Sequence, residues 1–144
     1  KKKMVAPKKE EVPPHINFST LDNAVDAVER SAAEYQKAFE KASANGGATL
    51  ATAQMRDLNA LLRQSERKLT TDEGLPGRFW YKHELYAPGA YTGYAAKAIP
   101  GVREALEQKN WKQAEQSADR VARVLQAEAQ LINEATAKLN AATH

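Results

Sequence analysis

Apolar residues recur along this chain with alternating steps of three and four positions, which is the period of an amphipathic α-helix. Three stretches of this pattern are long, and a shorter one follows Pro100, a residue that suits the first turn of a helix. Ser19 and Asp22 have the spacing of a capping box, and Asn110 with Gln113 can cap the last helix. The pattern predicts helices over about 19–44, 49–73, 100–108 and 110–140.

Each long helix carries one apolar stripe, which we expect to face the core. The three stripes are Leu21, Val25, Val28, Ala32, Tyr35 and Phe39; Ala51, Met55, Leu58, Leu62 and Leu69; and Ala114, Ala118, Val121, Leu125, Ile132, Ala135 and Leu139. Ser65 occupies the missing step of the second stripe, where a small side chain allows close helix contact. Glu128 interrupts the third stripe, and we interpret it as half of a structural ion pair with Arg63 or Arg67.

The breaks between the helices favour a bundle over one long coiled coil. Asn45-Gly46-Gly47 and Gly74 end the first two runs after three or four heptads. No strand signal of comparable strength appears, and Phe79-Trp80-Tyr81 is at most a brief extended piece. We therefore predict an all-α, up-and-down four-helix bundle with a long ordered aromatic loop between the second and third helices.

The stretch 74–101 interrupts this helical organisation with a connection far longer than the roughly two to eight residues usual between helices. It holds six of the ten aromatic residues and three of the six prolines. Compact domains keep such loops when the loop binds a partner or packs as structure in its own right. The function should therefore be sought in this loop.

The same stretch carries a family resemblance. The residues concerned are Gly74-Leu75-Pro76, Arg78, Tyr81-Lys82-His83, Tyr86-Ala87-Pro88, Tyr94-Ala95 and Pro100-Gly101. In order and spacing they resemble the C-terminal transferrin-receptor-like dimerisation domain, in the version found in glutamate carboxypeptidases. The N-terminal phrase Val12-Pro13-Pro14, Asn17-Phe18 and Leu21-Asp22-Asn23-Ala24 resembles the approach to that domain's first helix. The similarity thus covers nearly the whole chain.

This resemblance implies a dimerisation domain over 15–144, preceded by a flexible basic linker over 1–14. It also implies a parent whose protease domain carries two zinc ions, while this domain fixes a homodimer and closes one wall of the substrate pocket. The chain itself would then be no enzyme, and its parent a zinc-dependent carboxypeptidase or aminopeptidase outside the cytoplasm. The chain begins with Lys rather than Met, and we expect it to be a piece of that longer protein.

The sharpest site candidate follows from the same resemblance. In the glutamate carboxypeptidases, a lysine and the tyrosine after it grip the carboxylates of a C-terminal glutamate in the substrate. The matching positions here are Gly93 and Tyr94, so the phenol remains and the ammonium is absent. A carboxylate without its cation loses a charge-assisted bond worth about 1.5–3 kcal/mol, so we expect a broader specificity. Lys97 is a candidate substitute cation; the alternative is that Tyr94 only packs the loop.

The remaining loop positions are interpreted as structural. General base chemistry needs a cleft and an orienting partner, and no nucleophile or metal set accompanies His83, so we expect it to bond to the loop backbone. Tyrosines of the loop are expected to pack and to satisfy backbone groups through their hydroxyls. The predicted loop-structuring set is Arg78, Tyr81, His83, Tyr86 and Pro88.

Composition narrows the alternatives. The net charge of +3 belongs to residues 1–11, so the remainder is neutral and nucleic-acid binding is disfavoured. There is no cysteine, and His15, His83 and His144 lack metal-ligand spacing, so no metal site is predicted in this chain. No apolar run is long enough to span or enter a membrane. The competing function is a receptor-type protein-binding module of an inactive homologue, although the Arg-Gly-Asp motif of the receptor branch is absent.

Overall fold

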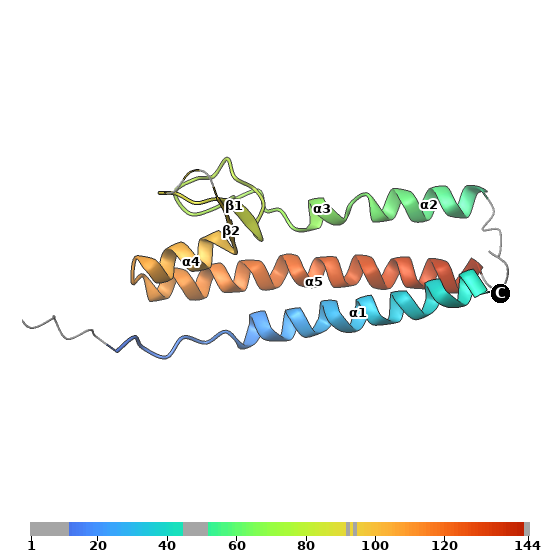
Figure 1. Cartoon of the computed structure of the whole chain (residues 1–144), viewed down its shortest axis with the longest axis horizontal. Helices are drawn as coiled ribbons and strands as arrows, with labels where there is room; N and C mark the ends of the chain where they lie inside the picture. Colours follow the sequence, from blue (N-terminus) through green and yellow to red (C-terminus); the bar gives the residue numbers. More distant parts are fainter. Residues whose placement is uncertain (1–11, 45–51, 92, 94, 143–144) are drawn as a thin grey trace, which may run out of the picture.

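The computed structural model describes residues 12–44, 52–91, 93 and 95–142, and this part of the chain is mostly helical. Its elements are α1 (Ser19–Ala44), α2 (Thr52–Leu62), α3 (Ser65–Lys68), β1 (Tyr86–Pro88), β2 (Ala96–Ala98), α4 (Pro100–Glu107) and α5 (Trp111–Ala142), as labelled in Figure 1. The predicted helical architecture is confirmed, and one small sheet is added to it.

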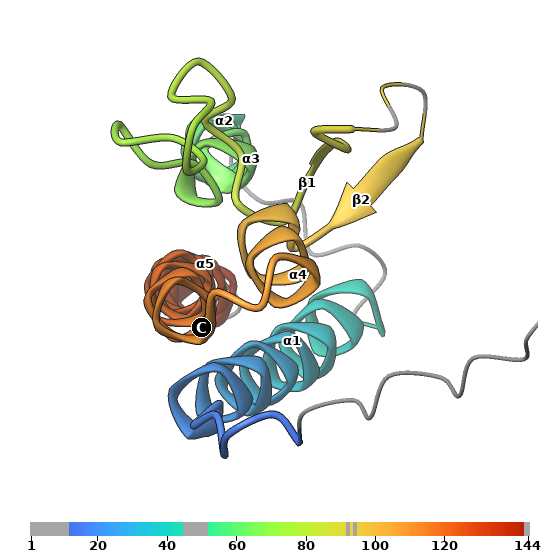
Figure 2. The same cartoon turned by 90° about the vertical axis from the view of Figure 1, so that its left-hand side faces the viewer.

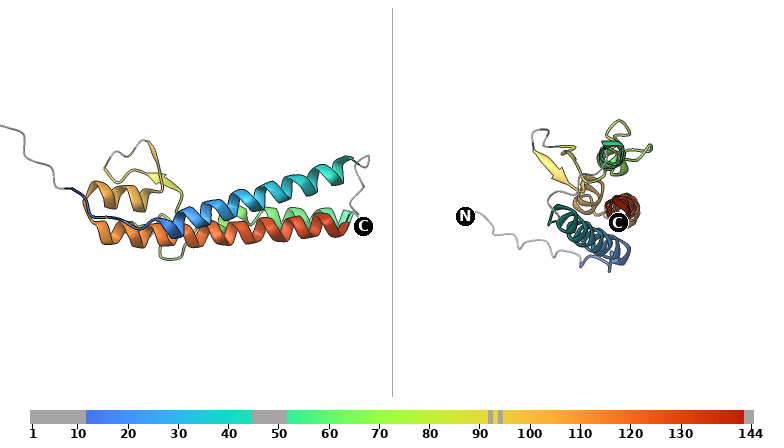
Figure 3. Two further views of the ribbon diagram at one scale, coloured as in Figure 1. Left: turned by 90° about the horizontal axis from the view of Figure 1, so that it is seen from below. Right: turned by 90° about the vertical axis from the view of Figure 1, so that its right-hand side faces the viewer.

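The helix α5 is the central element of the fold. Along most of its length α1 lies beside it and runs in the same direction (Figures 1 and 3). The helices α2, α3 and α4 contact another side of α5 and run the opposite way. Successive helices therefore do not alternate as an up-and-down bundle requires, because the connection 69–99 carries the chain onward along α5 instead of turning it back.

Small side chains form the long contact between α1 and α5. The buried residues of α1 are Ala24, Ser31, Ala38 and Ala42, and the buried alanines of α5 include Ala114, Ala118, Ala122 and Ala129. Small side chains let two helix backbones approach closely. At one end of the contact, the Asn17 amide donates to Glu115 (3.3 Å) and the Thr20 hydroxyl donates to Asp119 (2.7 Å). These bonds set the level at which α1 lies on α5.

The stripe of larger residues is therefore not the most buried face of α1, contrary to the prediction; of its members, Leu21 and Tyr35 pack against core clusters. Val25 and Phe39 are 40% and 54% exposed, and Ala32 is exposed as well. Val28 and Tyr35 are half-buried. Hydrophobic periodicity detects large apolar side chains, whereas alanine adds little to that signal. The helix is rotated so that alanines contact α5, which leaves the larger residues on one flank.

The second helix is shorter than predicted and interrupted. The helix α2 ends at Leu62, α3 is a single turn that ends at Lys68, and residues 49–51 lie outside the described part. Beyond Lys68 the backbone bonds to the loop instead, for example from the Thr71 amide to the Lys82 carbonyl (2.9 Å). A contact between segments so far apart is invisible to a local periodicity, which explains the difference.

Two local signals also act differently from their prediction. At the start of α1 the cap is Asn17, whose Oδ1 accepts the Ser19 amide (3.0 Å), while the Asp22 amide donates to a main-chain carbonyl. Gly74 lies beyond the helix and turns the loop with a φ of 67°. An added Cβ there would lie 2.3 Å from the Phe79 carbonyl oxygen, so the turn requires glycine.

The other helix boundaries agree with the pattern. The first helix occupies the predicted range, and α4 and α5 begin and end within two residues of theirs. Pro100 stands in the first turn of α4. Asn110 caps α5, because its Oδ1 accepts the Gln113 amide (3.2 Å). The predicted stop at 45–47 lies outside the described residues.

The structure adds a short antiparallel pair of strands to the predicted helices. The strands β1 and β2 pair in the register Tyr86↔Ala98, Ala87↔Lys97 and Pro88↔Ala96. Phe79-Trp80-Tyr81, the segment expected to be extended, is not in either strand. Three residues are too few to show the alternation that marks a strand in a sequence.

Two hydrophobic clusters lie along α5. One combines Val102 of α4 with Ala118 and Val121 of α5, and Phe18, Leu21, Leu85, Ile99, Leu106 and Leu125 pack against it. The other combines Ala38 and Ala42 of α1, Leu58 of α2, and Ala135 and Leu139 of α5. Leu85 and Ile99, which come just before β1 and just after β2, both pack against the first cluster, which thereby positions the long loop on the helices.

Replacing Ala24 by leucine should destabilise the fold by about 1–3 kcal/mol, because a fully buried alanine at a helix contact has no space for three more carbon atoms. Urea denaturation followed by circular dichroism measures the change. Ala33→Leu is the matched control, since Ala33 lies on the exposed side of the same helix. Equal midpoints for the two variants would contradict the close α1–α5 contact.

Candidate functional site

The loop 69–99 is attached to α4 by a nearly buried ion pair. The Nη2 of Arg78 lies 2.9 and 2.8 Å from the two carboxylate oxygens of Glu104, and the two side chains are only 13% and 10% exposed. The same carboxylate accepts the Ala90 amide (2.8 Å), and Nη1 of Arg78 donates to the Pro88 carbonyl (2.5 Å). One charged pair therefore gathers three points of the loop onto one helix.

Arg78 also lies over an aromatic ring. Its guanidinium carbon is 5.2 Å from the centre of the Tyr81 ring, which is the arrangement of a cation–π contact. The Tyr81 main chain bonds to its neighbours as well: its amide donates to the Arg78 carbonyl, and its carbonyl accepts the Leu75 amide (2.9 Å each). Tyr81 and Pro88, both placed in the loop-structuring set, thus share Arg78 as a partner.

His83 serves the loop backbone through one nitrogen. Its Nδ1 accepts the amides of Leu85 (3.2 Å) and Tyr86 (3.3 Å), so this nitrogen carries no proton in the arrangement described. The imidazole stacks on the Tyr86 ring with centroids 3.9 Å apart. Its Nε2 lies 3.3 Å from Glu66 of α3, a contact too poorly aligned to count as a hydrogen bond. The geometry is that of a structural histidine.

Tyr86 links this part of the loop to α3. Its hydroxyl donates to the Glu66 carboxylate. That hydrogen bond, with smaller contributions from burial and from the negative charge of Glu66, raises the pKa of Tyr86 above its ordinary value. Both residues lie at the surface, so the link orients the loop more than it stabilises the fold.

Two buried carboxylates have partners that the sequence did not reveal. Glu84, 1% exposed, accepts the Thr71 hydroxyl (2.6 Å). Glu128 accepts the Ser65 hydroxyl (2.5 Å) and not an arginine, so the predicted ion pair is wrong. Ser65 therefore does stand at a close helix contact. A glutamate beside a histidine or inside an apolar stripe is the only sequence signal of these sites.

The structure describes one of the two positions predicted to contact substrate. Gly93 is exposed, has a φ of 62°, and donates its amide to the Gly89 carbonyl (3.2 Å). A Cβ built there would meet no atom within 4 Å. Tyr94 lies outside the described residues. Lys97, the candidate substitute cation, is already paired with Glu107 of α4 (2.7 Å).

A cavity of about 460 Å³ lies between the loop and α4. Arg78, Tyr91, Glu104 and Gln108 are among its lining residues. Its two charged groups, Arg78 and Glu104, neutralise each other, and Gln108 donates weakly to the Tyr91 hydroxyl (3.5 Å). The cavity thus offers polar atoms but no uncompensated charge among the lining residues described.

Neither a metal site nor a membrane span is found in the described part of the chain. No three or more histidine, aspartate or glutamate side chains converge there as ligands of an ion. Over the same residues, every helix is too polar or too short to cross a bilayer.

Comparison with known proteins identifies the family. The model of the transferrin receptor-like dimerisation domain matches residues 16–133, which include α1 to α4, the whole loop and most of α5. The chain belongs to this family. The resemblance read from the loop motif is thereby confirmed.

Curated relatives share the name of one peptidase. A probable glutamate carboxypeptidase of Arabidopsis thaliana is 36% identical over 93 residues, covering 65% of this chain and 13% of the relative. Another, from Arthroderma benhamiae, is 37% identical over 98 residues, covering 67% of this chain and 13% of the relative. A second Arabidopsis protein of that name is 32% identical over 79 residues, or 55% of this chain and 11% of the relative. The chain spans about an eighth of these relatives.

Glu104→Ala should destabilise the domain by about 3 kcal/mol, because it leaves the Arg78 guanidinium nearly buried without a counter-charge. Glu107→Ala is the matched control on the same helix, where the lost pair with Lys97 is half-exposed and worth at most about 1 kcal/mol. Thermal and urea unfolding measure both. A loss for Glu104→Ala no larger than for Glu107→Ala would show that the ion pair does not hold the loop.

Tyr86 should ionise at a higher pH in the native chain than in the Glu66→Ala variant, as followed by ultraviolet absorbance in alkaline titration. The raised pKa means that the neutral phenol is favoured in the folded state, so this contribution to stability is lost as the pH rises past about 10. Glu66→Ala removes the acceptor and its charge and should lower the pKa of Tyr86 toward its ordinary value. An unchanged titration in Glu66→Ala would mean that the bond does not persist in solution.

Proposed function

We propose that this chain is the non-catalytic dimerisation domain of a glutamate carboxypeptidase-like zinc peptidase, and that its long loop forms part of the parent's substrate pocket. The carrying observation is the family match over 16–133, together with curated relatives named as probable glutamate carboxypeptidases. Because the chain corresponds to about an eighth of those relatives, the peptide-cleaving chemistry belongs to the remainder of the parent.

The zinc ions belong to that remainder in this proposal. We assign to this chain no metal ligand and no step of hydrolysis. Its contribution is positional: it holds two parent subunits together and presents a loop of fixed shape. The homodimer and the contact with the parent's own protease domain are the partners that this role requires.

Exposed aromatic residues of the loop support a contact with another domain. Phe79, Trp80 and Tyr91 are 70%, 60% and 81% exposed, although aromatic side chains of this size are mostly buried in a complete protein. The ion pair of Arg78 with Glu104 attaches the loop to α4, so these exposed rings belong to a loop whose position is fixed. The protease domain of the parent is the surface that we assign to them.

The specificity of the parent is proposed to be broader than a C-terminal glutamate. The Tyr94 hydroxyl would donate a hydrogen bond to the substrate carboxylate, whereas Gly93 offers no ammonium beside it. Lys97 does not replace the missing charge, because Glu107 already neutralises it. One directed hydrogen bond without a cation favours a carboxylate only weakly over a polar or apolar side chain.

Gly93→Lys in the full-length parent should raise the preference for C-terminal acidic residues over neutral ones, by restoring a cation beside Tyr94. A side chain has free space at this position, but the positive φ makes it strained by about 1–2 kcal/mol. Gly93→Asn is therefore the matched control, since asparagine tolerates this conformation and carries no charge. The ratio of kcat/KM for glutamate-ended and neutral peptides is the measurement.

Tyr94→Phe in the same parent should lower kcat/KM by the loss of one charge-assisted hydrogen bond, about 1.5–3 kcal/mol. A parent in which Tyr94→Phe leaves every substrate unaffected, and in which Gly93→Lys behaves like Gly93→Asn, would not use this loop in its pocket. A parent that lacks zinc ligands in its protease domain would instead favour a receptor-type role for the chain.

A further inference from the structure

One flank of α1 presents large apolar side chains that the described part of the chain covers only partly, since Tyr35 also packs against the cluster that contains Ala38 and Leu58. Val25 and Phe39 are 40% and 54% exposed, Ala32 is exposed, and Val28 and Tyr35 are half-buried. Their spacing of three and four residues places all five on one side of the helix. The rings of Tyr35 and Phe39 stack on each other with centroids 6.4 Å apart, which extends a continuous apolar strip.

The neighbouring helices continue this strip. On α2, Met55 is 43% exposed and Leu62 is half-buried. On α5, Ile132 is only half-buried, although Ala129 and Ala135, three residues before and after it, are buried. We call this surface the open face; it consists of Val25, Val28, Ala32, Tyr35, Phe39, Met55, Leu62 and Ile132.

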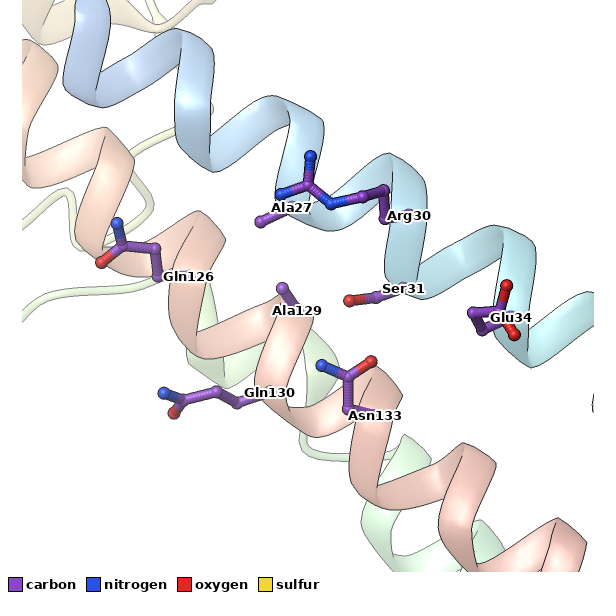
Figure 4. Close-up of a pocket in the computed structure, with 8 residues that line it drawn as sticks. All are labelled: Ala27, Arg30, Ser31, Glu34, Gln126, Ala129, Gln130 and Asn133. Carbon is purple, nitrogen blue, oxygen red and sulfur yellow. The ribbon is translucent and has the colours of Figure 1, made fainter.

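The polar sides of α1 and α2 point away from the open face. Arg30 and Glu34 line a groove between the other flank of α1 and α5, as Figure 4 shows. On α2, Gln54 and Asp57 line a separate cavity beside Lys138, on the outer side of α5. The apolar flanks of α1 and α2 lie opposite the groove and the cavity, and both flanks therefore belong to the open face.

At one end of the molecule, the space on α5 between α1 and α2 is occupied by another helix. The short helix α4 packs on α5 beside the start of α1, and the end-on views in Figures 2 and 3 show α1 and α2 on either side of this position. Because α4 has eight residues and α5 has 32, most of the length of α5 has no such neighbour among the described elements. The open face is the part of this surface, along α5, where no described helix lies between α1 and α2.

Opposite charges border the two sides of the open face. On the α1 side, Glu29 and Glu40 are exposed next to the apolar strip. On the α2 side, Arg56 and Arg63, seven residues apart, are exposed next to Met55 and Leu62. None of these four takes part in a salt bridge among the described residues. The face thus has one acidic border and one basic border.

The charges of the two borders also lie at matching levels along α5. Arg30 lines the groove beside Ala129, and Ser65 bonds to Glu128, so Glu29 and Arg63 lie at about the same level. Ala38, Ala42 and Leu58 join Leu139 in one cluster, which places Glu40 and Arg56 together at the next level. Each acidic residue of one border therefore has a basic counterpart directly across the face.

We propose that the open face is the surface by which two copies of this chain associate, about a two-fold axis parallel to α5. Such an axis keeps each residue at its own level and brings the α1 border of one copy against the α2 border of the other. Glu29 then faces Arg63 of the partner copy, and Glu40 faces its Arg56. The apolar strips pack between these pairs, with Ala32 leaving space at the centre. This assignment rests on the proposed dimerisation function.

The charge pattern selects a second copy over other occupants. A partner with a single sign of charge would suit one border and be repelled by the other. A two-fold axis perpendicular to the helices would bring the two acidic borders together, which like charges disfavour. Self-association is also the property for which the matched family is described.

Ala32→Glu is the first test, with Ala33→Glu as its control. Both alanines are exposed on α1, but only Ala32 lies in the open face, so only there would association bury a charge without a partner. Sedimentation velocity on the 144-residue chain and on the full-length parent should show dimers for the native protein and for Ala33→Glu. The dimer dissociation constant of Ala32→Glu should rise at least about tenfold, with unchanged helix content by circular dichroism.

Charge exchange tests the orientation. Glu29→Arg and Arg63→Glu should each weaken the dimer, because each places like charges across the contact, and the double variant should recover most of the loss. Dimers that persist unchanged in Ala32→Glu and in both single charge variants would overturn the open face as the interface while leaving the dimerisation function intact. A parent and a chain that are both monomeric at all concentrations would overturn the dimerisation function itself.

Discussion

The close approach of α1 to α5 is the constraint on which the other contacts depend. Ala24, Ser31, Ala38 and Ala42 are the residues of α1 that become buried, and none of them is larger than serine or alanine. Two helices that meet through such residues bury little apolar area per residue, but they bring many main-chain and Cβ atoms into contact. The same choice leaves the larger residues of α1 at the surface, where they are available to a partner.

The loop depends on a second, electrostatic constraint. Arg78 and Glu104 are almost completely withdrawn from solvent, and the carboxylate is further satisfied by the Ala90 amide. A pair of this kind adds little net stability but strongly disfavours any arrangement that separates its members. The loop can therefore project Phe79, Trp80 and Tyr91 into solvent without changing its base.

Much of this organisation could be predicted from local sequence. The features that could not be predicted have one physical cause in common. The range of α1, the Pro100 start of α4 and the Asn110 cap of α5 follow from interactions within a few residues. The loop was recognisable from its length and aromatic content. What failed depends on distant partners: the end of the second helix at a loop backbone, and the Ser65 partner of Glu128. The alanine face of α1 was also missed, because alanine has a small apolar surface and contributes little to the hydrophobic periodicity of a helix.

The candidate site shows the same division. The hydrogen bonds of His83 to the loop backbone were expected, since no nucleophile or set of metal ligands accompanies this residue in the sequence. The pairing of Arg78 with Glu104 and of Lys97 with Glu107 could not be foreseen, because α4 lies 26 and 10 residues further along the chain. The motif therefore indicated where the site lies. Which of its charged residues are paired could be known only from the three-dimensional structure.

The parallel course of α1 and α5 also has a consequence for how the chain acquires its shape. Asn17 and Glu115, which bond at the start of that contact, are 98 residues apart. Contacts of such separation form late, because a long segment must be closed before they are gained. During synthesis on the ribosome, α1 lacks its main contact until residues 111–142 have emerged. We therefore expect this helical domain to fold more slowly than a bundle whose helices contact only their neighbours in sequence.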